Sequence, residues 1–72
     1  MYTAHAPKMY NIIRMFKDAP TIIVKRNVTL EEAQAHCHNP ETHSNTCTTE
    51  EGRALTAQYG MWFDGYDEAD RY

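Results

Sequence analysis

The segment VTLEEAQAHCHNPETHSNTC, residues 28–47, constrains the fold most, because it contains a helix with a marked start and a marked end. Thr29 followed by Glu32 forms a capping box, in which the threonine hydroxyl accepts one free backbone amide and the glutamate reaches back to another. Pro40 disfavours helical backbone at Asn39 and has no amide proton to donate. The sequence therefore predicts a helix from Leu30 to about His38.

One face of this helix is apolar. Leu30, Ala33 and Cys37 follow one another at spacings of three and four residues, which places them on one side. Val28, just before the cap, is expected to pack on Ala33 as a hydrophobic staple. We predict that this face lies against a β-hairpin formed by the preceding residues.

Two runs rich in aromatic and β-branched residues precede the helix and predict that hairpin. The first is YNIIRMF, residues 10–16, and the second is TIIVK, residues 21–25, which is expected to end at Arg26-Asn27. Asp18-Ala19-Pro20 supplies turn residues between them. A period of two puts three residues of the first strand on one side: Tyr10, Ile12 and Phe16.

The second half of the chain is less regular. Residues 39–47 are polar and predict an irregular loop. Thr48 and Glu51 form a second possible capping box, and Gly60 stands where a helix would end, so a short helix is possible over Glu50–Tyr59. Gly52 weakens such a helix by about 1 kcal/mol relative to alanine, which leaves a frayed turn or loop as the alternative.

The last apolar run is Met61-Trp62-Phe63, which predicts a short third strand. Gly65 is expected to bend the chain there, and a polar tail follows with Asp67, Glu68 and Asp70. Side chains alternate along a strand, so either Trp62 or Phe63 is expected in the core and the other outside.

Length allows one domain at most, here residues 9–72 after a flexible leader of residues 1–8. A chain of 72 residues buries only about 60% of the surface that it exposes when unfolded, so a disulfide, a metal or a partner would help it. No apolar run reaches the roughly 18 residues of a membrane span, and the start lacks the apolar region of a secretory signal. We therefore expect a soluble protein made in the cytoplasm, without a membrane partner.

The formal charge of −3 is unevenly distributed. Residues 1–29 are basic and residues 30–72 are strongly acidic. Four cations of the predicted hairpin form a candidate basic patch for phosphates: Arg14, Lys17, Lys25 and Arg26. The acidic remainder and a pI of 5.7 oppose nucleic-acid binding, so we do not expect a dedicated nucleic-acid binder.

Both cysteines and three of the four histidines fall within residues 36–47. Cys37, His43 and Cys47 are candidates for a disulfide or a zinc site. A Cys37–Cys47 disulfide would contribute on the order of 2–3 kcal/mol, and two reduced thiols with Cys37 in the core are the alternative. The ligand spacing matches no standard zinc template, and neither an oxyanion site nor a glycine-rich phosphate loop is recognisable. We predict no catalytic residues, no enzyme activity and no cofactor, with zinc as the alternative.

Aromatic residues next to acidic ones near the C-terminus predict a protein-binding surface, because aromatic side chains supply much of the affinity at interfaces. The candidate residues are Trp62, Phe63, Asp64, Tyr66, Asp67 and Glu68.

Several segments occur together in a recognisable order: YNIIR at residues 10–14, LEEAQAHC at 30–37, NPET at 39–42, TC at 46–47 and WFDGY at 62–66. In this respect the chain resembles a group of small uncharacterised proteins of actinobacterial phages, over about Met9 to Glu68. The resemblance implies synthesis in the cytoplasm of an infected bacterium, which favours reduced cysteines. It supplies no catalytic residues.

Together these features predict an α+β fold, with a small three-stranded antiparallel sheet made of the hairpin and a C-terminal strand. One main helix packs on this sheet, and a second short helix is possible. The predicted function is that of a non-enzymatic phage accessory protein that binds a host or phage protein, as in host takeover or counter-defence. The alternatives are a small zinc- or nucleic-acid-binding regulator and a virion or assembly component.

Overall fold

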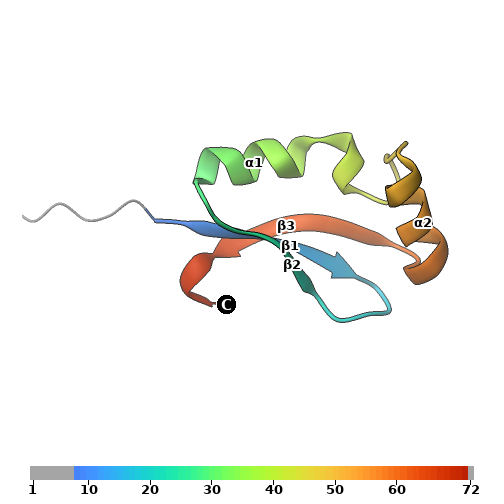
Figure 1. Cartoon of the computed structure of the whole chain (residues 1–72), viewed down its shortest axis with the longest axis horizontal. Helices are drawn as coiled ribbons and strands as arrows, with labels where there is room; N and C mark the ends of the chain where they lie inside the picture. The colour runs from blue at the N-terminus through green and yellow to red at the C-terminus, as the bar shows by residue number, and fades with distance from the viewer. Residues whose placement is uncertain (1–7, 72) are drawn as a thin grey trace, which may run out of the picture.

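The computed structural model describes residues 8–71 and has the predicted α+β architecture (Figure 1). The expected leader lies outside the described residues, apart from Lys8. Five main elements and two short 3₁₀ turns follow one another: β1 (Tyr10–Phe16), β2 (Ile22–Val28), α1 (Leu30–His38), a 3₁₀ turn (Pro40–Thr42), α2 (Glu50–Tyr59), β3 (Trp62–Glu68) and a 3₁₀ turn (Ala69–Arg71).

The three strands form one antiparallel sheet in the order β2-β1-β3. The hairpin strands β1 and β2 are neighbours, as predicted, and β3 pairs with the other side of β1. The β1–β3 ladder is regular over its whole length, from Tyr10 opposite Glu68 to Phe16 opposite Trp62. This pairing brings the end of the chain back along its first strand, and α1 lies over one face of the sheet (Figure 1).

The β1–β2 ladder is irregular, and β2 is longer than the sequence predicted. The strand does not end at Arg26-Asn27 but continues to Val28 through two shifts of register. Asn27 has a φ of 56°, in the left-handed region that asparagine tolerates better than most residues. Its backbone N–H donates to Oδ1 of the buried Asn11 at 3.1 Å, so a polar side chain in the central strand supports the bulge.

Both ends of α1 lie where the sequence predicted them. The Thr29 hydroxyl accepts the backbone N–H of Glu32 at 3.1 Å, and the helix ends at Asn39 before Pro40. The Thr29 hydroxyl in turn donates to Oε1 of the Glu32 carboxylate at 3.4 Å. Thr29 is therefore the N-cap, and the second contact of the capping box is made to its side chain.

The predicted staple is present, since Val28 and Ala33 belong to one buried cluster with Ile12, and Tyr10 packs at its edge. The helix, however, packs on β1 and β3, whereas the sequence predicted that it would pack on the β1–β2 hairpin. Leu30, expected in the interface, is 39% exposed. The small Ala33 makes the close contact, and β2 is left largely uncovered on the helix side.

The structure forms α2 over Glu50–Tyr59, which settles the helix-or-loop alternative in favour of a helix. Its N-cap is Thr49, one residue later than predicted, because Glu41 binds the backbone N–H groups of both Thr48 and Thr49. Gly60 ends the helix with a φ of 77°, as expected for a C-terminal glycine.

Strand β3 differs most from the prediction. It continues straight through Gly65 to Glu68, so the predicted bend is absent and two residues of the predicted polar tail belong to the sheet. A Cβ atom on Gly65 would come within 2.8 Å of Cε of Met15 on the neighbouring strand. Glycine at this position makes room for a side chain of β1 and does not turn the chain.

Candidate functional site

A cluster of three charged or ionisable side chains lies between α1 and the sheet. Arg14 and Asp64 are direct cross-strand partners on β1 and β3. The Arg14 Nε and Nη2 atoms donate to the two carboxylate oxygens of Asp64 at 2.6 and 2.9 Å. Nε2 of His36, from α1, lies 2.7 Å from Oδ2 of Asp64, whose side chain is completely buried. We call Arg14, His36 and Asp64 the ion cluster.

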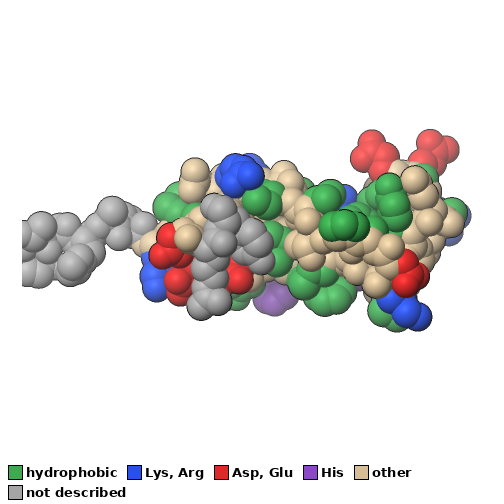
Figure 2. All heavy atoms as spheres, turned by 90° about the horizontal axis from the view of Figure 1, so that it is seen from below, with side chains coloured by type: hydrophobic (Ala, Val, Ile, Leu, Met, Phe, Trp, Pro, Cys, Tyr) green, Lys and Arg blue, Asp and Glu red, His purple; other side chains and the backbone are tan. Residues whose placement is uncertain are grey.

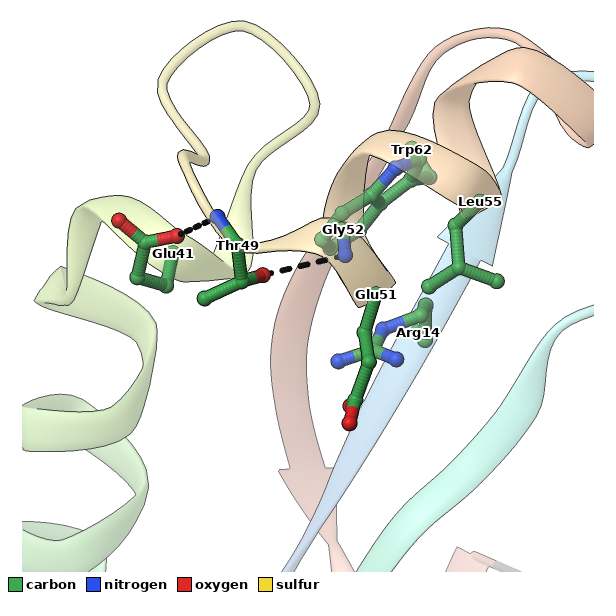
Figure 3. A pocket seen from close by; sticks show the side chains of 7 residues that line it. All are labelled: Arg14, Glu41, Thr49, Glu51, Gly52, Leu55 and Trp62. Atoms are coloured by element: carbon green, nitrogen blue, oxygen red, sulfur yellow. Dashed lines mark hydrogen bonds between the residues drawn. The ribbon is translucent and has the colours of Figure 1, made fainter.

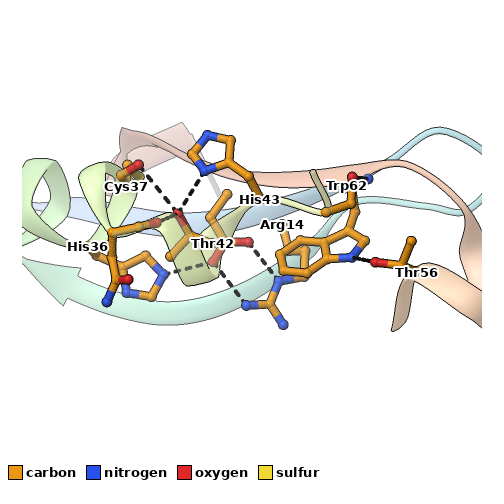
Figure 4. A network of polar contacts seen from close by, with 10 residues as sticks. Arg14, His36, Cys37, Thr42, His43, Thr56 and Trp62 are labelled. Atoms are coloured by element: carbon orange, nitrogen blue, oxygen red, sulfur yellow. Dashed lines mark hydrogen bonds and ion pairs between the residues drawn. The ribbon is translucent and has the colours of Figure 1, made fainter. Parts of the chain in front are cut away.

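The ion cluster is linked to α2 through Trp62. The Arg14 guanidinium carbon lies 4.7 Å from the centre of the Trp62 ring, which is a cation–π distance. The indole Nε1–H donates to Thr56 of α2 at 3.0 Å. Figure 4 shows Arg14 between His36 and Trp62, so one chain of polar contacts holds both helices on the sheet.

A carboxylate that orients a histidine is also an element of general-base sites, but a nucleophile is needed beside it. Cys37, the next residue in the chain, is a poor candidate. Burial, and then the negative charge of Asp64, raise the pKa of the Cys37 thiol. A raised pKa keeps the thiol protonated near neutral pH, which lowers its reactivity.

The three disulfide or metal candidates do not form one site. Cys37 and Cys47 are both free thiols in this structure. Cys47 packs toward α2, where a Cβ atom on Gly52 would lie 2.9 Å from its Sγ. His43 contacts the Thr42 hydroxyl at 3.2 Å and stacks on Phe63. Over residues 8–71 the structure shows no group of three or more metal-binding side chains that could hold an ion.

A hollow of about 220 Å³ lies at the N-terminus of α2 (Figure 3). It is lined by Arg14, Glu41, Thr49, Glu51, Gly52, Leu55 and Trp62. Two of its charged groups already have partners, since Arg14 binds Asp64 and Glu41 binds the amides that precede α2. The hydrogen bonds from the Thr48 amide, followed by those from its hydroxyl, lower the pKa of Glu41. This hollow is therefore a structural junction of helix and loop.

The predicted partner-binding residues are divided between the two faces of the sheet. Trp62 and Asp64 are buried on the helix side, with 2% and 3% exposure, and do not belong to a surface. Tyr66 also lies on that side, where its ring meets Tyr10 edge to face. Phe63 alternates with them, points to the other face and is 44% exposed. Of Trp62 and Phe63 one is thus inside and one outside, as predicted.

The last two predicted partner-binding residues lie at the C-terminal end of β3 and are half-buried. Asp67 pairs in the ladder with Asn11, and Glu68 binds Lys8 at 3.0 Å. The six residues therefore do not form one continuous surface, because strand alternation separates them.

The face of the sheet away from the helices carries an apolar patch. Met15 of β1 and Phe63 of β3 are direct cross-strand partners there, and Met61 is 54% exposed beside them. A small cavity of about 110 Å³ opens between these side chains. The side of the molecule away from α1 shows hydrophobic side chains along much of its length (Figure 2). We call Met15, Met61 and Phe63 the sheet-face patch; Ile13 of β1, only 6% exposed, belongs to the core.

The predicted basic patch loses its central member. Arg14 points to the helix side and is bound to Asp64. Lys17, Lys25 and Arg26 are exposed. Of these three, Lys25 forms an ion pair with Glu32, at 4.0 Å between two largely exposed side chains. The predicted basic patch is therefore reduced to three surface cations, because Arg14 lies on the helix side and does not connect them.

The ion cluster was missed at the level of sequence, although one signal pointed to it. Arg14 stands between Ile12 and Phe16 in the alternation of β1, on the same side of the strand as these two apolar residues. A charge at such a position needs a buried partner of opposite sign. The sequence contains nine acidic residues after position 29, and only the register of β1 and β3 selects Asp64.

Comparison with protein-family models, with curated proteins and with solved structures finds no match. The resemblance to small phage proteins therefore stays a prediction. Within the described part of the chain, neither helix has the length and apolar character needed to cross a membrane.

Proposed function

We propose that the protein is a non-enzymatic phage accessory protein that binds another protein, from the host or the phage, through the sheet-face patch. The observation that carries this proposal is the difference between Phe63 and its neighbours in β3. Phe63 is a large aromatic residue, 44% exposed, between Trp62 and Asp64, which are both buried.

The composition of the patch supports a protein partner. Large exposed side chains next to one another on a sheet face are typical of interaction surfaces. Phe63 is held by stacking on His43, with ring centres 6.3 Å apart and an angle of 12° between the rings. A side chain that is already positioned loses little conformational entropy on binding, so Phe63 is suited to be an anchor.

The state of the polar groups also favours binding over catalysis. The three members of the ion cluster are engaged with one another and hold the helices in place. In the hollow at the start of α2, Arg14, Glu41 and Thr49 are already hydrogen-bonded. These polar groups are therefore already used within the fold, whereas the large apolar side chains of Met61 and Phe63 are exposed.

The alternatives have less support. A zinc-binding regulator would need a ligand group that the described residues do not provide, and a nucleic-acid binder would have to manage without Arg14. No structural feature favours a virion or assembly component, and the protein content of purified particles would decide that alternative.

The test is affinity capture from an actinobacterial lysate with three forms of the tagged protein. The wild type should retain a reproducible partner, and Phe63→Ser should lose it. Tyr66→Ser is the matched control, because Tyr66 is 39% exposed in the same strand but lies on the helix side. Circular dichroism checks that both variants are folded. Equal capture by wild type and Phe63→Ser, or loss of the partner with Tyr66→Ser alone, would contradict the proposal.

A further inference from the structure

The most exposed residue of the sheet-face patch carries a sulfur atom. Met61 is 54% exposed, the highest value among the exposed large hydrophobic residues of the described chain. It immediately precedes β3, and its carbonyl oxygen accepts the backbone N–H of Lys17 at 3.0 Å. This hydrogen bond continues the pairing of β1 with β3 and fixes the backbone at Met61. An ordered strand end therefore presents this thioether to solvent.

Met15, the other methionine of the patch, is held differently. Its Cε atom lies against Gly65, where an added Cβ atom would come within 2.8 Å of it. The sulfur is bonded directly to Cε, so it lies close to the sheet as well, and Met15 is half-buried. Both methionines line the cavity of about 110 Å³ beside Phe63. The two thioethers of one patch thus differ in their access to solvent.

The other sulfur atoms of the described chain are less open to an oxidant. Burial, and then the charge of Asp64, raise the pKa of the Cys37 thiol, and the protonated thiol is the less reactive form. Sγ of Cys47 donates to the Ser44 carbonyl oxygen at 3.7 Å and lies in the loop that packs on α2. Met9 is half-buried. Because a thioether has no proton to lose, its reaction with an oxidant depends on exposure, which favours Met61.

We propose that Met61 is a site of reversible oxidation by peroxide, and that its sulfoxide closes the sheet-face patch to the partner. The regulation rests on the proposed function of this patch. In the reaction the O–O bond of hydrogen peroxide breaks and one oxygen bonds to the thioether sulfur, which loses two electrons. The hydroxide that leaves takes the proton of the transferred oxygen and becomes water. A methionine sulfoxide reductase reverses the step with two electrons from a dithiol.

The sulfoxide changes the chemistry of the patch. A thioether is apolar and polarizable and makes favourable contacts with aromatic rings such as that of Phe63. A sulfoxide is polar, and its oxygen accepts hydrogen bonds from water in the free protein. An apolar partner surface would remove that water and leave the oxygen without a donor, which costs free energy. Oxidation of Met61 therefore weakens the complex.

The fold itself tolerates the added oxygen. Trp62, the next residue, is 2% exposed, and its indole N–H donates to Thr56 at 3.0 Å. Side chains alternate along a strand, so the side chain of Met61 points away from this core contact. The oxidised protein should therefore keep its secondary structure, and the change is confined to the surface.

The first part of the test needs no partner. The full chain is treated with hydrogen peroxide, and site-resolved mass spectrometry follows the sulfoxide at each methionine. Met61 should be oxidised at least about threefold faster than Met15 in the folded protein, and the two rates should become equal in denaturant. Equal rates in the folded protein, or loss of the circular dichroism signal on oxidation of Met61, would overturn the proposal.

The second part measures the regulation by affinity capture from an actinobacterial lysate. The reaction is stopped when Met61 is oxidised, and dithiothreitol then reduces oxidised thiols but leaves the sulfoxide. Oxidised wild type and oxidised Met15→Leu should each retain at most about one tenth of the partner that their reduced forms retain. For Met61→Leu the two amounts should be equal, and treatment of oxidised wild type with the reductase should restore capture. Equal capture by oxidised and reduced wild type, or an equally large loss in Met61→Leu, would overturn the proposal.

Failure of this inference differs from failure of the proposed function. If reduced wild type retains a partner that Phe63→Ser loses, and oxidation of Met61 leaves the capture unchanged, only the regulation is wrong. If reduced wild type retains no partner, the proposed function is contradicted and the regulation is contradicted with it.

Discussion

The two faces of the sheet show how differently neighbouring residues of one strand are used. On the helix side of β3, Trp62 and Asp64 are almost fully buried and their polar atoms are bonded to other elements. On the other side, Phe63 is nearly half exposed, stacks on the loop residue His43 and lies opposite Met15 of β1. The comparison teaches that the helix side holds the fold together, whereas the other side is available for a partner.

The largest loss of stability is expected from a substitution of Asp64, the shared partner in the ion cluster. Asp64→Ala leaves Arg14 and His36 without their common partner in a half-buried site. Removing one member of a buried ion pair costs about 3–5 kcal/mol, and we expect the lower end because both partners keep some exposure. Chemical denaturation measures the change.

Asp70→Asn is the control for this substitution, since Asp70 is exposed near the end of the described chain. Its effect should stay within about 0.5 kcal/mol. A loss of stability no greater for Asp64→Ala than for Asp70→Asn would show that the ion cluster does not hold the fold together.

Alanine substitutions at Gly52 in α2 and Gly65 in β3 each add one methyl group, so their costs in stability compare the packing on the helix side with that on the open face of the sheet. Gly52→Ala should cost about 1–3 kcal/mol despite the higher helix propensity of alanine, because the new Cβ would lie 2.9 Å from Sγ of Cys47 and 3.1 Å from Oγ1 of Thr49. Gly65→Ala should cost less, since its close neighbour is the flexible end of Met15 on the open face. Thermal denaturation of both variants measures the difference.

Cys47→Ala in the Gly52→Ala background separates the cause of this cost. If the sulfur is the obstacle, the double variant should recover part of the lost stability. Equal costs at Gly52 and Gly65 would contradict the difference in packing between the two faces.

Glu41 joins the loop to α2 on the helix side and gives a pH-dependent effect. Its folded pKa is lowered, so its contribution to stability is present above the ordinary pKa of 4.5 and is lost as pH falls through the folded value. Glu41→Gln should therefore melt below wild type at neutral pH, and the gap should narrow as the pH falls below 4.5. A gap that stays the same over this range would refute the role of the carboxylate.

The smallest effect is expected at Cys37. Because its raised pKa keeps the thiol protonated, alkylation of Cys37 should be slower in the folded protein than in denaturant at the same mildly alkaline pH. Site-resolved mass spectrometry after timed iodoacetamide labelling measures both rates. Equal rates would mean that α1 does not shield this thiol.

The features that were predicted correctly depend on local chemistry. The ends of α1 follow from Thr29 and Pro40, the hairpin strands from β-branched runs, and the opposite directions of Trp62 and Phe63 from strand alternation. These interactions join residues that are close in the chain, so the sequence pattern contains them.

The features that were missed depend on contacts between distant segments. Asp64 becomes a core residue only because β3 brings it opposite Arg14, 50 positions earlier. The length of β3 follows from the same pairing, and the bulge at Asn27 depends on the side chain of Asn11. The open region over β2 exists because α1 packs toward β3, which no local pattern specifies.

Site-resolved oxidative footprinting, with the free protein and with the complex captured from lysate, tests the contrast between the two faces most directly. In the free protein Met61 and Phe63 should be modified strongly while Trp62 is not, and in the complex Met61 and Phe63 should become protected. Modification of Trp62 in the folded free protein, or unchanged modification of Met61 and Phe63 in the complex, would contradict the account.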